Sequence, residues 1–125
     1  MLNSVMYVTV FVRDQDKALD FYTRVLGLEK RADTPTPSGA RFLTVAPTGE
    51  GPQIVLWPGT PGAATSSNGP IPGAIILGTS DCRKDVEVLT SRGAELEAPI
   101  VEQPRALVAV LRDPDGNRLM LRENR

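Results

Sequence analysis

The chain has 125 residues, of which 41% are hydrophobic and 23% are charged, and its formal net charge is −1. This length and composition predict a single globular domain, and so small a net charge gives no electrostatic reason to expect nucleic acid or a membrane as a partner. No apolar run approaches the roughly 20 residues of a membrane-spanning helix. Cys82 is the single cysteine, so it forms no internal disulfide, and we expect a cytoplasmic location.

The sequence contains no histidine. This removes the commonest general base, the commonest metal ligand and every Ser-His or Cys-His relay. Cys82 therefore has no imidazole to activate it as a nucleophile, and we interpret it as a bystander.

The first predicted element is a strand over residues 5–12, which are rich in β-branched and aromatic side chains. Asp14 then supplies an oxygen that can cap a helix, and Gly27 suits the C-terminal end of that helix. Between these two residues the helix is expected to bury one stripe at three- and four-residue spacing, formed by Ala18, Phe21, Tyr22 and Val25.

A second strand is predicted to begin at residues 28–31. Residues 33–39 are expected to form a loop, because two prolines and a glycine interrupt strand pairing. Residues 40–46 and 53–57 then predict a hairpin. The stretch 59–73 is rich in Gly, Pro, Ser and Ala, and we interpret it as a linker.

The second half of the chain repeats this order of elements. They are a strand over 74–78, a helix from Asp81 to Arg92 ended by Gly93, a short strand near 95–97, and a hairpin from 107–112 to 118–122. The turn of that hairpin has the sequence Asp-Pro-Asp-Gly-Asn. It predicts a tight turn, because Pro presets the first φ angle and Gly accepts a positive one.

Three anchor residues recur at a distance of 67 positions: Asp14 and Asp81, Pro47 and Pro114, and Gly49 and Gly116. The chain therefore predicts two βαβββ units, about 4–58 and 74–123, within one domain spanning 1–125. Two such units give eight strands with helices on one face only, which is an α+β arrangement. A functional site is expected where equivalent positions of the two units converge.

The period-2 alternation of a strand assigns the two faces of the predicted sheet. Val8, Val10 and Val12 share the aliphatic side, on which the helices are expected to pack. The opposite side is chemically mixed and is expected to line a cup: Tyr7, Thr9, Phe11, Gln53, Val55, Trp57, Ala74, Ile76, Arg118, Met120 and Arg122.

Two stretches resemble a known family. The segment VTVFVRDQDKALDFYTRVLGLE and the ending RDPDGNRLML are similar to the glyoxalase/bleomycin-resistance/dioxygenase superfamily, also called the vicinal oxygen chelate fold. The resemblance covers essentially the whole chain. It implies paired βαβββ modules, a cupped eight-stranded mixed sheet with helices on its outer face and a ligand inside, and commonly a homodimer. It leaves open whether the modules pair within one chain or are swapped between two.

In metal-dependent members of that family, four positions in the cup coordinate a divalent ion. By the resemblance, these positions fall here on Tyr7, Val55, Ala74 and Met120. Divalent ions need several oxygen or nitrogen donors, usually including carboxylate or imidazole, and of the four only Tyr7 carries such a donor. We therefore expect no metal and no cofactor.

The first functional hypothesis is metal-independent binding of a small aromatic or amphipathic molecule, similar to the drug-sequestering members of the family. Tyr7, Phe11 and Trp57 offer flat surfaces for an aromatic ligand. Two arginines can clamp a carboxylate or phosphate. The expected ligand-binding residues are Tyr7, Thr9, Phe11, Gln53, Val55, Trp57, Ile76, Arg118, Met120 and Arg122.

Each of these residues also has a plain structural interpretation. Trp57 equally suits a dimer interface, and Arg118 and Arg122 are more often solvated residues at strand ends. A third interpretation of the whole chain follows, in which the cup is the seam of a non-catalytic dimeric interaction module.

A second hypothesis is an isomerase- or lyase-type enzyme without a metal. Such an enzyme needs a positioned acid or base, and Tyr7 is the best catalytic candidate on the predicted cup face. Carboxylates can also reach the cup from loops, namely those of Asp33, Glu50, Glu97 and Glu102. The sequence names neither the ligand nor a reaction.

Overall fold

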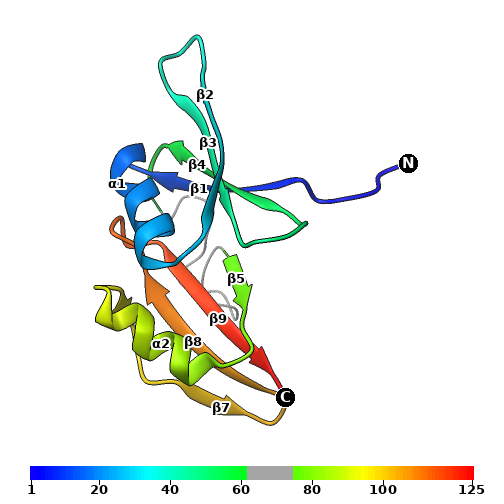
Figure 1. Cartoon of the computed structure of the whole chain (residues 1–125), viewed down its shortest axis with the longest axis vertical. Coiled ribbons are helices and arrows are strands. Elements are labelled where there is room, and N and C mark those ends of the chain that lie inside the picture. Colours follow the sequence, from blue (N-terminus) through cyan, green and yellow to red (C-terminus); the bar gives the residue numbers. More distant parts are fainter. Residues whose placement is uncertain (62–74) are drawn as a thin grey trace. The chain divides into compact units, whose positions relative to one another are not determined.

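The computed structural model describes residues 1–61 and 75–125. The chain divides into two compact units, Met1–Ala64 and Thr65–Arg125, each with a sheet and a helix of its own (Figure 1). Ala74 and most of the predicted linker 59–73 lie outside the described residues, so the predictions for them stay predictions. Within the described segments, no helix is long and apolar enough to cross a membrane.

The first unit holds four strands and a helix that continues as a π-helix. Its elements are β1 (Tyr7–Val12), α1 (Gln15–Asp20), η1 (Phe21–Val25), β2 (Glu29–Pro35), β3 (Arg41–Ala46) and β4 (Gln53–Pro58). The strand order is β1-β4-β3-β2, with β1 parallel to β4 and the other neighbours antiparallel. The helix α1 packs against β3 and β4 of this sheet.

The first helix begins and ends as the sequence predicts. The carboxylate of Asp14 accepts hydrogen bonds from the backbone N–H groups of Asp16 and Lys17, at 2.9 and 3.1 Å. Gly27 follows the helix with φ +78°, a conformation that side chains disfavour. The predicted apolar stripe is buried, with Ala18, Phe21, Tyr22 and Val25 at most 6% exposed.

The strand β2 is longer than predicted. It continues to Pro35, into the segment 33–39 that was expected to be a loop, so that prediction is wrong over its first three residues. Proline is compatible with this position because β2 is an edge strand, where a missing N–H breaks no ladder bond on the open side. Arg41 reinforces the pairing through an ion pair with Asp33 at 2.9 Å.

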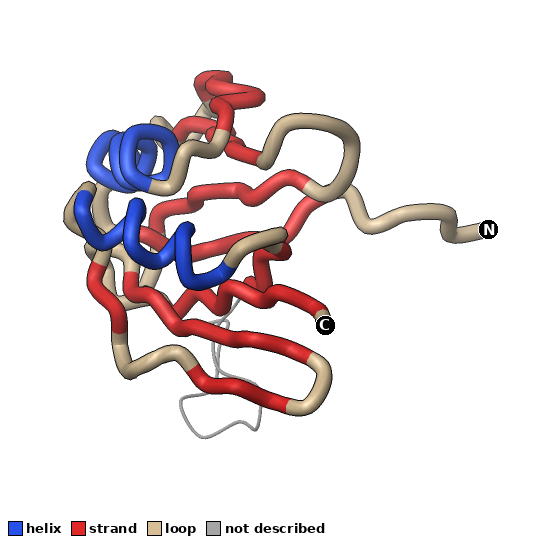
Figure 2. The backbone as a smooth tube through the Cα atoms, turned by 60° about the horizontal axis from the view of Figure 1, so that its bottom comes forward, coloured by secondary structure: helices blue, strands red, loops and turns tan. Residues whose placement is uncertain are grey.

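The second unit repeats this plan with one additional strand. Its elements are β5 (Ile75–Gly78), α2 (Cys82–Ser91), β6 (Glu95–Leu96), β7 (Val101–Gln103), β8 (Ala106–Arg112) and β9 (Arg118–Asn124). The order is β5-β9-β8-β6, and β7 also pairs with β8. The helix α2 packs against β6, β8 and β9. Figure 2 shows the helices in blue and the strands in red.

The extra strand β7 was not predicted. Both β6 and β7 pair with β8 and occupy the edge of β8 that β2 occupies on β3. Pro99 lies between them, and the segment 97–100 interrupts what would otherwise be one strand. The α+β class is confirmed. The described strands number nine, in sheets of four and five, where eight strands in one sheet were expected.

The hairpin turn between β8 and β9 is confirmed. The carboxylate of Asp113 accepts hydrogen bonds from the backbone N–H groups of Asp115 and Asn117, at 2.9 and 2.8 Å. Gly116 takes φ +84°, which glycine accepts without a steric penalty. Asp113 is only 5% exposed, so these bonds satisfy a buried carboxylate.

The aliphatic face of each sheet forms the core under its helix. In the first unit Val10, Val12 and Leu56 are at most 1% exposed. In the second unit Leu119 and Leu121 are at most 5% exposed. The alternation read from the sequence thus identified the helix-facing side of both sheets.

Candidate functional site

The parallel pairing of β1 with β4 brings the predicted first-unit residues onto one sheet face. Tyr7 lies opposite Gln53, Thr9 opposite Val55, and Phe11 opposite Trp57. Residues at the same level of neighbouring strands point to the same side of a sheet. These six side chains therefore share the face away from the buried valines of β1.

The strand β3 adds two residues to this face that the sequence analysis missed. Thr44 pairs with Val55, so Thr44 and Phe42 point to the same side as Val55. The rings of Tyr7 and Phe42 meet edge to face, with centroids 5.4 Å apart and planes at 82°. The alternation of residue types over 41–46 carries the signal, because Phe42 and Thr44 alternate with the aliphatic Leu43 and Val45.

Aromatic side chains are concentrated on this surface. The chain has one Trp, two Tyr and three Phe, all within residues 1–61. Phe21 and Tyr22 are buried on the helix, while the other four lie on the sheet face and none is fully buried. We call this surface the aromatic face, and it comprises Tyr7, Thr9, Phe11, Phe42, Thr44, Gln53, Val55 and Trp57.

A hollow of about 290 Å³ borders one end of the aromatic face, where the chain enters β1. Its lining is formed by Ser4, Val5, Met6, Tyr7, Gly51 and Gln53. Tyr7 is 42% exposed, and within the described residues its hydroxyl group makes no hydrogen bond. The hollow therefore combines an aromatic ring, an amide and apolar side chains, the usual lining of a small-molecule site.

Phe11 is held at the other end of the face by a close backbone approach. A Cβ atom added to Gly59 would lie 2.5 Å from Cδ1 of the Phe11 ring. The N–H of Gly59 also donates a hydrogen bond to the carbonyl of Val12 at 3.1 Å. Residue 59 must therefore be glycine for Phe11 to keep this position.

The second unit places its predicted residues on one face as well. Ile76 lies opposite Met120 and Gly78 opposite Arg122. Met120 is buried with Ala106 and Val108 in a small apolar cluster, while Ile76 is 47% exposed. This face is aliphatic where the first unit's face is aromatic.

Arg118 is paired with a carboxylate of its own chain. Its guanidinium donates to Glu97 at 2.7 Å, and Arg112 donates to the other oxygen of Glu97, also at 2.7 Å. The hydrogen bond from Arg118, with the nearby positive charge, holds the pKa of Glu97 below its usual range. Arg122 instead donates to the amide oxygen of Asn124 at 2.7 Å. Arg122 is therefore the more available of the two predicted anion-binding arginines.

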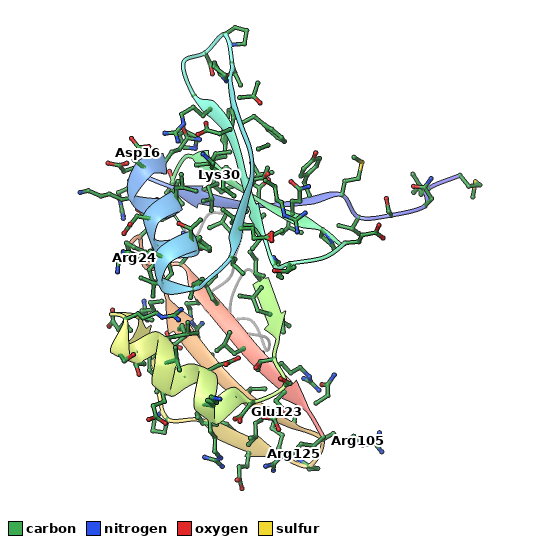
Figure 3. The ribbon with its side chains drawn as sticks, in the orientation of Figure 1. Asp16, Arg24, Lys30, Arg105, Glu123 and Arg125 are labelled. Carbon is green, nitrogen blue, oxygen red and sulfur yellow. The ribbon has the colours of Figure 1, made fainter. Side chains whose placement is uncertain are left out.

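Ion pairs also occupy two of the three other carboxylates considered as acids or bases, those of Asp33 on β2 and Glu102 on β7, whereas Glu50 has no ion pair within the described residues. Asp33 pairs with Arg41, and Arg41 also pairs with Asp16. Figure 3 shows Asp16 at the start of α1. The hydrogen bond from Arg41 lowers the pKa of Asp33. Glu102 pairs with Arg83 at 2.5 Å. A carboxylate with a lowered pKa is a weak base at neutral pH, so Asp33 and Glu97 are poorly suited to general-base catalysis.

Comparison with known proteins decides the family. A model of the Glyoxalase/Bleomycin resistance protein/Dioxygenase superfamily matches residues 4–121. The chain belongs to this superfamily. TnmS3, an antibiotic binding protein from Streptomyces sp. CB03234, is 34% identical, with a TM-score of 0.83 over 99% of this chain and 98% of that one.

Two further similar proteins extend across nearly the whole chain. A superfamily member from Sphaerobacter thermophilus is 34% identical, with a TM-score of 0.84 over 98% of both chains. The protein YetH of Bacillus subtilis is 28% identical over 98% of this chain and 100% of its own length. The resemblance inferred from the sequence is confirmed.

The positions that the sequence resemblance assigned to metal ligands do not carry the donors that a metal needs. Val55 offers no donor atom, and Met120 offers only a thioether sulfur, while Ala74 lies outside the described residues. Within residues 1–61 and 75–125, no three His, Cys, Asp or Glu side chains gather closely enough to hold an ion. Tyr7 alone does not supply the donor set that a divalent ion requires.

Proposed function

We propose that the protein binds a small aromatic molecule on the aromatic face, without a metal. The observation that supports this most strongly is the gathering of four of the six aromatic side chains on the sheet face away from the core. Flat rings at the surface of a rigid sheet offer stacking and edge-to-face contacts to another flat ring. Such contacts are worth about 0.5–1.5 kcal/mol per pair beyond the burial of area.

The similarity to TnmS3 supports the same proposal. That protein is an antibiotic binding protein, and the present chain shares its fold and 34% of its residues over nearly the whole length. We propose by analogy that this chain sequesters a small molecule of drug size. The homodimer and the cytoplasmic location expected from the sequence belong to this proposal.

We assign ligand contacts to the predicted residues of the second unit as well. Ile76 and Met120 offer apolar contact, and Arg122 offers a donor for an anionic group of the ligand. Arg118 is expected to contribute less to binding an anionic group, because Glu97 already neutralises its charge.

The enzymatic alternative has less support. Tyr7 is the one predicted acid or base on the aromatic face. The carboxylates of Asp33, Glu97 and Glu102 are each paired with an arginine, which leaves Glu50 as the one of the four carboxylate candidates without an ion pair within the described residues. A catalytic acid or base is most effective when its pKa lies near the working pH. The lowered pKa values of Asp33 and Glu97 move these groups away from that range.

Equilibrium dialysis against three flat aromatic compounds (9-fluorenone, xanthone and acridine) tests the proposal. We expect saturable binding of at least one, weakened about tenfold by Tyr7→Ala or Trp57→Ala, which corresponds to about 1.4 kcal/mol. Val101→Ala is the matched control, because Val101 is an exposed apolar residue of β7 outside the proposed site. Circular dichroism should show an unchanged fold in all three variants.

Two outcomes would contradict the proposal. One is the absence of saturable binding for all three compounds. The other is equal affinity in the wild type, the two aromatic variants and the control, which would place binding away from the aromatic face.

A further inference from the structure

The amide of Gln53 has a defined orientation on the aromatic face. The hydroxyl of Thr44 donates a hydrogen bond to Oε1 of Gln53 at 2.7 Å, and Thr44 is 0% exposed. If the amide were flipped, Nε2 would donate to that hydroxyl, and the buried hydroxyl proton would lose the acceptor that this bond supplies. A buried donor without an acceptor is costly. The oxygen of Gln53 therefore faces Thr44.

This orientation leaves the nitrogen of the amide for another partner. Within the described residues, Nε2 of Gln53 has no hydrogen-bond acceptor. Gln53 is half-buried, lies opposite Tyr7 in the parallel register, and lines the hollow of about 290 Å³ together with that ring. The hollow thus has an amide donor next to an aromatic side chain.

We propose that Gln53 donates a hydrogen bond to a carbonyl-type oxygen of the ligand, and that Thr44 is the positioning residue that orients the amide. This inference rests on the proposed function and narrows its ligand class to flat aromatic molecules that carry a carbonyl group on an edge. A ligand without such an acceptor leaves the N–H groups of Gln53 covered and unpaired. A site built around a hydrogen bond discriminates strongly against analogues that lack the matching group.

The second unit offers no equivalent donor. Val8 pairs with Ile54 as Ile75 pairs with Leu119, so the position equivalent to Gln53 is Arg118. Arg118 is engaged with Glu97 at 2.7 Å. Recognition of an uncharged carbonyl is therefore assigned to the first unit.

A matched pair of probes isolates this hydrogen bond. Fluorene and 9-fluorenone share one flat ring system and differ by a CH₂ group in place of the carbonyl. The measured quantity is the ratio of their Kd values, because the ratio cancels contributions from the rings. We expect Gln53→Met to lower the preference for 9-fluorenone about tenfold, as loss of one hydrogen bond predicts, while the Kd of fluorene changes little.

Two further variants test the positioning role and guard against misfolding. Thr44→Val should reduce the preference only in part, because the amide then rotates freely but keeps its donor. The double variant Thr44→Val/Gln53→Met removes both partners, leaves no buried unpaired hydroxyl, and should match Gln53→Met in selectivity. Thr90→Val is the control, since its hydroxyl bonds to the carbonyl of Val86 in α2, outside the site.

The outcomes separate this inference from the proposed function. If both compounds bind and their Kd ratio is the same in the wild type, Gln53→Met and the double variant, the role of Gln53 is overturned while the aromatic face remains a binding site. If neither compound binds the wild type, and xanthone and acridine also fail, the proposed function falls and this inference falls with it.

Discussion

The two units share one scaffold but differ on the sheet face away from the helix. Val8 pairs with Ile54 in the first unit, and Ile75 pairs with Leu119 in the same parallel register in the second. The helix-facing positions are aliphatic in both, because each unit must fill a close-packed core beneath its helix. Packing therefore constrains this side of both sheets in the same way.

The opposite face shows no such agreement. Where the first unit has Phe11 opposite Trp57, the second has Gly78 opposite Arg122 at the equivalent level. Residues 62–125 contain no aromatic side chain at all. Once the helix-facing side supplies the core, the other face is free to carry specific chemistry, and only the first unit carries an aromatic surface.

The largest expected effect tests the aliphatic, helix-facing core that the two units have in common. Leu56→Ala and Leu121→Ala each remove a buried side chain, at 0% and 5% exposure, from equivalent levels of the two sheets. We expect each variant to lose about 2–5 kcal/mol of unfolding free energy. Urea denaturation measures both values. If either variant lost less than about 1 kcal/mol of unfolding free energy, the two leucines would not contribute equally to the cores of their units.

A glycine substitution tests the aromatic face of the first unit. Gly59→Ala places a Cβ atom 2.5 Å from Cδ1 of Phe11, so the ring must move. We expect a loss of about 1–3 kcal/mol of unfolding free energy and weaker binding of 9-fluorenone. The matched control is Gly78→Ala, because the space around Gly78 is open. Equal effects of the two substitutions on stability and binding would contradict the role given to Phe11.

The features that the sequence predicted correctly are those that depend on residues close together in the chain. The helix caps at Asp14 and Asp81 and the glycines at 27 and 93 were predicted, because each acts within one turn of its helix. The division of β1 into two faces was predicted too, since alternation is a property of the strand itself. Local chemistry was sufficient for these features.

Features that depend on distant segments were missed or left open. The strand β7 has three residues and gains its structure from pairing with β8. Thr44 and Phe42 join the aromatic face only through the register of β3 with β4. Arg118 was considered as a free anion clamp, but its partner Glu97 lies 21 positions away. No local pattern in the sequence gives these contacts.

The smallest expected effect concerns the ion pair of the second unit. Arg118 and Arg112 lower the pKa of Glu97 in the folded state. The ion pair therefore stabilises the fold at pH values above the usual pKa range of a glutamate. That contribution is lost as the pH falls through the lowered pKa, when Glu97 takes up a proton. Glu97→Gln should therefore lose less stability than the wild type between neutral pH and pH about 3.

Urea midpoints at the two pH values measure this difference. Asp33→Asn is the matched variant in the first unit, because Arg41 lowers the pKa of Asp33 by a similar hydrogen bond. Asp33 is more exposed to solvent, so a smaller change is expected there. Identical pH dependence in the wild type and Glu97→Gln would show that the ion pair contributes nothing measurable.

The most direct test of the aromatic face uses Trp57, the single tryptophan of the chain, as its own reporter. Trp57 emission is followed while 9-fluorenone is added to the wild type, Tyr7→Ala and the Val101→Ala control. The account predicts saturable quenching in the wild type and the control, with a markedly higher Kd in Tyr7→Ala. Quenching that rises linearly without saturation in all three proteins would contradict it.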